Sequence, residues 1–143
     1  ICGGGSDMAT DLLYKYGISI GLAFQLQDDL LDTYADSDEF GKPVGGDILE
    51  GKKTFLLTNA LARADEPARR SLLELLSDRT IVPAEKIARV RAIYDRLGIR
   101  ELTEKAVAAY FADANLALDA LEVAPDRLKP LRELTAELQG RRK

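Results

Sequence analysis

The residues best suited to chemistry are three aspartates in one five-residue run, Asp28, Asp29 and Asp32. Successive residues of an α-helix turn by about 100°, so Asp28 and Asp32 lie about 40° apart on one face, with Asp29 beside them. Like charges within one turn repel each other, and neighbouring leucines predict partial burial, which increases that cost. The run therefore predicts a bound cation. Because every ligand is an oxygen, we expect magnesium or manganese rather than zinc.

Lysines follow the acidic run in a glycine-rich segment. Lys42 lies among glycines, and Lys52 and Lys53 lie where a helix begins. Ammonium groups and backbone N–H groups in such places bind anionic phosphates. Because Mg²⁺ keeps several waters and binds substrate phosphates, the carboxylates and lysines together predict a site for a magnesium diphosphate. Gln25, one turn before the aspartates, extends this polar stripe along the helix.

Each of these features also has an ordinary structural explanation. An acidic run of this kind is most often a solvated helix face, and glycines with a lysine are most often only a loop. The basic end, Arg141-Arg142-Lys143, is usually a solubilising tail. The residue types alone leave these explanations open.

Composition excludes several kinds of site. The chain has no histidine and one cysteine, Cys2, which excludes Ser-His-Asp and Cys-His catalysis, imidazole-based metal sites and an internal disulfide. A single thiol is typical of a reducing compartment, so we expect a cytoplasmic protein. A net charge of −4 gives no reason to expect nucleic acid as a partner, and no apolar run is long enough to span a membrane.

Helical periodicity covers most of the chain and predicts an all-α protein with no internal repeat and no interdomain linker. A glycine-rich loop is expected over 36–51, with one turn started by Asp47 and Glu50 at capping-box spacing. Asp65 is expected to cap the third helix, and Gly98 to end the fourth. The predicted helices cover 7–34, 52–64, 67–76, 83–97, 101–122 and 130–139.

The continuous stretch 21–54 carries a resemblance to a known family. It reads Gly-Leu-Ala-Phe-Gln-Leu-Gln-Asp-Asp-Leu-Leu-Asp, then Phe-Gly-Lys-Pro-Val-Gly-Gly-Asp, then Glu-Gly-Lys-Lys-Thr. This resembles the second aspartate-rich motif and the flexible loop of the trans-isoprenyl diphosphate synthases, which make farnesyl, geranylgeranyl and longer polyprenyl diphosphates. The resemblance implies a helical bundle of the isoprenoid synthase type around a deep cavity, usually as a homodimer.

The resemblance also implies roles for single residues. Asp28, Asp29 and Asp32 would form the second metal-binding motif, with Asp28 as a direct ligand of Mg²⁺. Lys42 would hold the allylic diphosphate and Lys52 would assist, so that Asp28, Lys42 and Lys52 are the expected catalytic residues.

Further roles concern the substrates. Phe24 and Gln25 match a pair that lines the substrate cavity in the family. Asp47 matches a loop carboxylate near the metals, and the basic tail resembles a segment that covers the second diphosphate in some members.

The implied activity is prenyl transfer. An allylic diphosphate ionises with the help of Mg²⁺ and condenses with isopentenyl diphosphate to give a longer polyprenyl diphosphate. In this family the departing diphosphate is thought to remove the final proton, which suits a chain without histidine. Two alternatives remain: a class I terpene cyclase fragment, and a non-catalytic helical subunit or interaction module of a synthase.

The family uses two aspartate-rich motifs, and this chain carries one. We therefore expect residues 1–143 to be the C-terminal part of a single polyprenyl synthetase domain whose N-terminal half is missing. We expect the chain to be inactive by itself.

Overall fold

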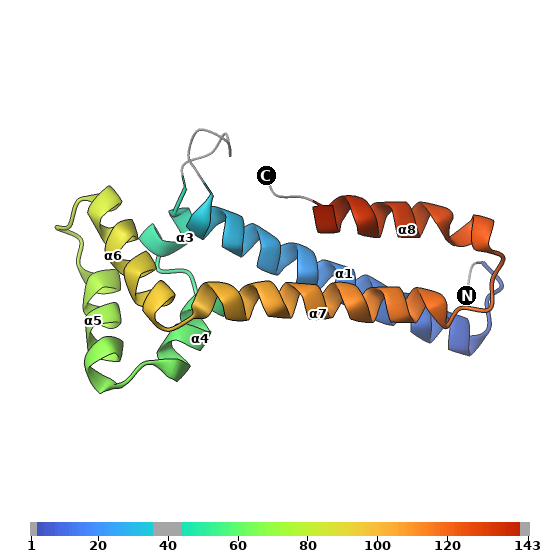
Figure 1. Ribbon diagram of the computed structural model, residues 1–143, viewed down its shortest axis with the longest axis horizontal. Coiled ribbons are helices and arrows are strands. Elements are labelled where there is room, and N and C mark those ends of the chain that lie inside the picture. The colour runs from blue at the N-terminus through green and yellow to red at the C-terminus, as the bar shows by residue number, and fades with distance from the viewer. Residues whose placement is uncertain (1–2, 36–43, 141–143) are drawn as a thin grey trace. The chain divides into compact units, whose positions relative to one another are not determined.

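The computed structural model describes residues 3–35 and 44–140, and the regular secondary structure of these residues is entirely α-helical (Figure 1). The all-α prediction is confirmed. No described helix combines the length and the apolar character that crossing a membrane requires. The helices are α1 (Asp7–Tyr34), α3 (Gly46–Leu49), α4 (Phe55–Arg63), α5 (Glu66–Ser77), α6 (Pro83–Arg96), α7 (Ile99–Asp119) and α8 (Pro125–Gly140).

Local capping explains where several helices begin and end. The Asp65 side chain accepts a hydrogen bond from the N–H of Ala68 at 2.9 Å, so Asp65 caps α5 as predicted. Pro83 opens α6, where its fixed φ and missing N–H cost nothing. Gly98 follows α6 with φ of +66°, a left-handed conformation that glycine adopts without strain.

Two helices begin elsewhere than predicted, and α7 ends at Asp119 rather than at residue 122. Helix α4 begins at Phe55 rather than at residue 52, because Thr54 adopts an extended conformation and caps the helix. Helix α8 begins at Pro125 rather than at Pro130, so that Pro130 lies inside the helix. Pro130 removes one helical hydrogen bond, and the burial of Leu128, which is 7% exposed, offsets this cost.

The chain divides into two compact units. The first unit comprises the described residues up to Gln25 and those from Ala106 onward. The second unit comprises the described residues between Leu26 and Lys105. Helices α1 and α7 each contribute residues to both units, and the aspartate-bearing end of α1 belongs to the second.

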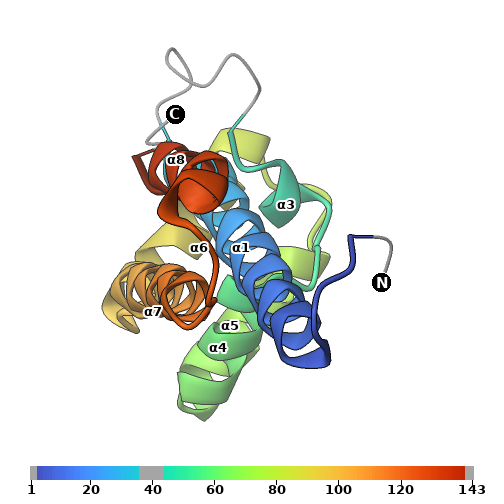
Figure 2. The ribbon, with the colours of Figure 1, turned by 90° about the vertical axis from the view of Figure 1, so that its right-hand side faces the viewer.

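The first unit is built from the beginning of α1, most of α7, and α8 (Figures 1 and 2). The Tyr16 hydroxyl lies 3.1 Å from the carbonyl oxygen of Leu131, to which it donates, and 3.0 Å from Oγ1 of Thr135. These bonds join α1 to α8 across more than one hundred residues of sequence. The core of this unit consists of Tyr16, Ala114, Ala117, Leu118, Leu121 and Leu128.

The second unit is organised around α6, which packs against α3, α4 and α5. The end of α1 joins this core through Leu30 and Tyr34. Arg91 and Arg100 lie over the Tyr34 ring, 5.4 and 5.1 Å from its centroid, in cation–π contacts. The core side chains are Ile48, Leu56, Leu57, Ala60, Leu72, Val90, Tyr94 and Ile99.

Candidate metal and diphosphate site

The carboxylates of the acidic run differ in exposure. Asp29 is buried, with 5% of its surface exposed, whereas Asp28 and Asp32 are half-buried. Their positions follow from α-helical spacing at the end of α1, which is fixed to the second unit's core by Leu30 and Tyr34. The predicted partial burial of this run is confirmed.

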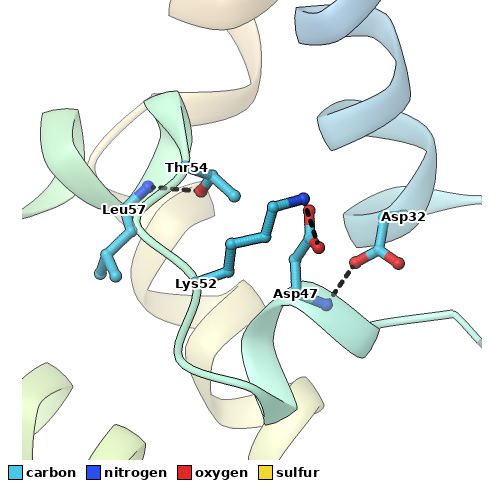
Figure 3. Close-up of polar contacts among 5 residues, drawn as sticks. All are labelled: Asp32, Asp47, Lys52, Thr54 and Leu57. Atoms are coloured by element: carbon cyan, nitrogen blue, oxygen red, sulfur yellow. Dashed lines mark hydrogen bonds and ion pairs between the residues drawn. The ribbon is translucent and has the colours of Figure 1, made fainter.

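Helix α3 is attached directly to Asp32. The N–H of Gly45 donates to the backbone carbonyl of Asp32 at 2.6 Å, and the N–H of Asp47 donates to the Asp32 carboxylate at 2.9 Å (Figure 3). Gly45 has φ of +87° and precedes α3. This left-handed residue turns the chain so that consecutive N–H groups face the end of α1.

The predicted capping box at Asp47 is wrong. Helix α3 begins at Gly46, its N-cap is Gly45, and no side-chain hydrogen bond caps it. Asp47 lies inside this short helix, and its carboxylate instead accepts a hydrogen bond from Nζ of Lys52 at 2.9 Å. The turn at Gly51, with φ of +65°, brings Lys52 back to Asp47.

Thr54 determines how α4 meets the site. Its Oγ1 accepts a hydrogen bond from the N–H of Leu57 at 3.2 Å (Figure 3), which caps the helix. The N–H of the first helical residue, Phe55, is directed at the Asp29 carboxylate. The positive end of α4 therefore faces a buried negative charge, which is favourable.

As far as the structure describes the chain, the negative charge of the cluster is only partly compensated. The pKa of Asp29 is raised to about 6, first by burial and then by the charge of Asp47, while Lys52 and the Phe55 N–H oppose the shift. Burial also raises the pKa of Asp32, against the hydrogen bond from the Asp47 N–H. The hydrogen bond to Asp47 raises the pKa of Lys52. An added cation would stabilise the ionised form of these carboxylates.

These residues could hold a hard divalent cation whose coordination shell is completed by other ligands. Within residues 3–35 and 44–140, no three carboxylate or thiol side chains already converge as a complete metal cage. Magnesium does not require one, because it is usually held by one or two carboxylates together with water and substrate phosphates. The half-buried Asp28 and Asp32 are suited to that role, and the ammonium of Lys52 is suited to a phosphate.

The structure brings together only some of the predicted site residues. Asp29, Asp32, Asp47 and Lys52 belong to one electrostatic cluster, and Asp28 also acts on Asp29. Lys42, Cys2 and the tail 141–143 lie outside the described residues. Phe24 is half-buried and Gln25 is exposed on α1.

Sequence reasoning missed two features. One is the Phe55 N–H that faces Asp29, and the other is the pairing of Asp47 with Lys52. The Lys-Lys-Thr sequence before an apolar run is a signal for the first, because threonine is a common N-cap. The second depends on a turn at Gly51 that no spacing rule specifies.

Comparisons with known proteins agree on one family. The family model for polyprenyl synthetase matches residues 1–97. A short chain isoprenyl diphosphate synthase from Methanothermobacter thermautotrophicus is 40% identical over 136 residues, which cover 95% of this chain and 38% of that protein. The chain belongs to the polyprenyl synthetase family.

Solved structures show the same fold. A geranylgeranyl pyrophosphate synthase matches with a TM-score of 0.84 and 33% identity, over 98% of this chain and 44% of the other. The Corynebacterium glutamicum geranylgeranyl pyrophosphate synthase, complexed with isoprenyl diphosphate and magnesium, matches with a TM-score of 0.84 and 34% identity, over 97% and 39%. The predicted isoprenoid synthase type of helical fold is confirmed. The chain spans less than half the length of these relatives.

Proposed function

We propose that this chain supplies the second metal and diphosphate site of a trans-prenyltransferase, which condenses an allylic diphosphate with isopentenyl diphosphate. The observation that carries the proposal is the cluster of Asp29, Asp32, Asp47 and Lys52, where carboxylates for a hard cation adjoin an ammonium for an anion. The names of similar proteins support it, because they are isoprenyl and geranylgeranyl diphosphate synthases. They favour a synthase over a terpene cyclase or a non-catalytic module.

Roles follow from exposure and charge. Asp28 and Asp32 would hold Mg²⁺ or Mn²⁺ with the diphosphate, and Asp29 would position them from its buried place beside α4. Lys52 would donate to the diphosphate, because 54% of its side chain is exposed and its ammonium is within reach of solvent. When bound, the cation would draw negative charge onto the leaving diphosphate.

Further parts of the proposal rest on the resemblance. Lys42 would hold the allylic diphosphate, while Phe24 and Gln25 would line the substrate cavity. The whole enzyme would act as a homodimer, and a cytoplasmic location stays a prediction.

The proposal is tested in a chimera. The M. thermautotrophicus synthase aligns with 95% of this chain, so its aligned segment can be replaced by residues 1–143. We expect the chimera to elongate dimethylallyl diphosphate with labelled isopentenyl diphosphate in the presence of Mg²⁺. Asp28→Asn and Asp32→Asn should each reduce kcat at least 100-fold, as losses of transition-state electrostatics do.

The matched control is Asp113→Asn, an exposed aspartate on α7, which should retain the activity of the chimera. A chimera that has the helical content and melting behaviour of its parent but forms no product would overturn the proposal. Activity that survives both aspartate substitutions would do the same.

A further inference from the structure

Lys52 occupies an unusual electrostatic position. Its ammonium donates to Asp47 at 2.9 Å, and among the described residues it is the positive side chain that acts on both Asp29 and Asp32. Within the described part of the chain, three carboxylates on α1 and α3 therefore share the ammonium of Lys52. Lys52 therefore places positive charge at the same carboxylates that a divalent cation would contact.

Asp47 connects this ammonium to the carboxylates of α1. Its backbone N–H is bonded to the Asp32 carboxylate, while its own carboxylate is bonded to Lys52 (Figure 3). A cation held by Asp32 would therefore lie close to the Asp47 carboxylate and to the Lys52 ammonium. Like charges at such separations repel, so the cation and Lys52 compete for the same carboxylates.

The two partners differ in their freedom to move. The Asp47 side chain is 16% exposed and lies in a short helix tied to α1, whereas the Lys52 side chain is 54% exposed. Exposed ion pairs contribute little to stability. The pair can therefore open by movement of the lysine alone, and an anion in solvent can draw the lysine away.

We propose that Lys52 is the resident counter-ion of this carboxylate cluster and leaves Asp47 when a divalent cation and a diphosphate bind. The departure of Lys52 toward the anion frees the Asp47 carboxylate for the cation or its water ligands. Each ligand thereby increases the affinity for the other, as linkage requires. This inference rests on the proposed function and adds a coupling mechanism to it.

The decisive measurement is Mg²⁺ affinity in the absence of any phosphate-like anion. Isothermal titration of the 143-residue chain with MgCl₂ is compared for wild type, Lys52→Met and Lys52→Gln. If Lys52 competes with the metal, removal of its charge should tighten Mg²⁺ binding by about threefold to tenfold, because the repulsion between the ammonium and the cation is removed. A lysine that only binds diphosphate would leave Mg²⁺ affinity unchanged, and a lysine that only supports the fold would weaken Mg²⁺ binding when removed.

Three further variants make the result specific. Lys52→Arg keeps the charge and should keep the wild-type affinity. Lys53→Met removes a neighbouring exposed lysine and should change the affinity less than twofold. In an Asp47→Asn background, Lys52→Met should lose most of its effect, because the competition acts through Asp47.

A second titration examines the coupling itself. With methylenediphosphonate present, and its own Mg²⁺ binding subtracted, wild type should bind Mg²⁺ more tightly than without it, and Lys52→Met should show little such increase. The exchange is overturned if, without the anion, Lys52→Met and Lys52→Gln keep their helical content but bind Mg²⁺ no more tightly than wild type does. That result leaves the proposed function intact. A folded wild-type chain that binds neither Mg²⁺ nor methylenediphosphonate overturns both.

Discussion

At the scale of single residues, Asp29 determines how the cluster responds to pH. Its carboxyl is buried beside Asp47 and Asp28, and its pKa is raised from 3.8 to about 6. Between these values the folded chain holds a proton that the unfolded chain has lost. The stabilisation from this group is therefore complete below about pH 4 and is lost as the pH rises through 6.

We predict that Asp29→Asn raises the melting temperature of the metal-free chain at pH 7.5 by about 3 °C, which corresponds to roughly 1 kcal/mol after allowance for screening. The amide removes the buried charge, and its oxygen still accepts from the Phe55 N–H. Thermal melts in EDTA from pH 4 to 7.5 measure the effect. Wild type should lose stability over this range more steeply than the variant.

Asp113→Asn is the control for this series, because Asp113 is exposed on α7. Its pH profile should parallel that of wild type. Parallel profiles for Asp29→Asn and wild type would instead show that the buried carboxyl does not control the pH dependence. Addition of MgCl₂ at pH 7.5 should stabilise wild type more than Asp29→Asn.

Part of the cluster could be predicted from the sequence because part of it lies on one helix. The relative positions of Asp28, Asp29 and Asp32 follow from helical spacing, whatever the rest of the chain does. The position of Asp47 follows from Gly45 and from packing against α6, which no periodicity encodes. The sequence pattern predicts that Lys52 binds an anion. Its hydrogen bond to Asp47 depends on the turn at Gly51, which the pattern does not specify.

At the scale of elements, α3 depends on Gly45. A Cβ added there would lie 2.5 Å from Cδ1 of Ile87 on α6, and the residue has φ of +87°. We predict that Gly45→Ala lowers the free energy of unfolding by about 2–4 kcal/mol, from the left-handed conformation and the overlap together. Urea denaturation followed by circular dichroism measures this loss.

Gly51→Ala provides the matched comparison. Gly51 also has a left-handed conformation, with φ of +65°, but a Cβ there meets nothing. It should lose only about 1–2 kcal/mol. Ile87→Ala should cost less in the Gly45→Ala background than in wild type, because it removes the overlap. Equal costs in both backgrounds would show that the contact with Ile87 is not the cause.

Helix α4 depends on its cap. Thr54 is 8% exposed and accepts from the Leu57 N–H. We predict that Thr54→Ala costs about 1 kcal/mol of stability, whereas Thr54→Ser, which keeps the hydroxyl, costs less than half as much. Urea melts compare the two variants. A serine variant as unstable as the alanine variant would contradict the capping role.

The presence of the helices was predictable from apolar spacing. Their boundaries were predictable where a single residue determines the boundary. Pro83 and Asp65 are such residues, and both mark their helices correctly. Pro130 misled the prediction because proline usually opens a helix, whereas here the packing of Leu128 extends α8 back to Pro125. Tertiary packing of this kind is absent from local sequence.

At the scale of the whole molecule, the chain corresponds to 38% of its M. thermautotrophicus relative and contains one Asp-Asp-x-x-Asp run. We predict that the 143-residue chain binds Mg²⁺ but forms no prenyl product by itself. Incubation with dimethylallyl and labelled isopentenyl diphosphates measures this, with the M. thermautotrophicus synthase as positive control. Turnover near that of the control would contradict the prediction.

The arrangement of the two units in the sequence has a consequence for biosynthesis. The described residues of the second unit all fall between Leu26 and Lys105, whereas the first combines described residues from both sides of that range. During translation, the beginning of α1 leaves the ribosome before α7 and α8 exist. At about 5–20 residues per second, Tyr16 waits roughly 6–24 s for Leu131 and Thr135, which follow it by 115 and 119 residues. Throughout that interval the apolar side chains around Tyr16 lack their partners on α7 and α8 and are open to non-native contacts.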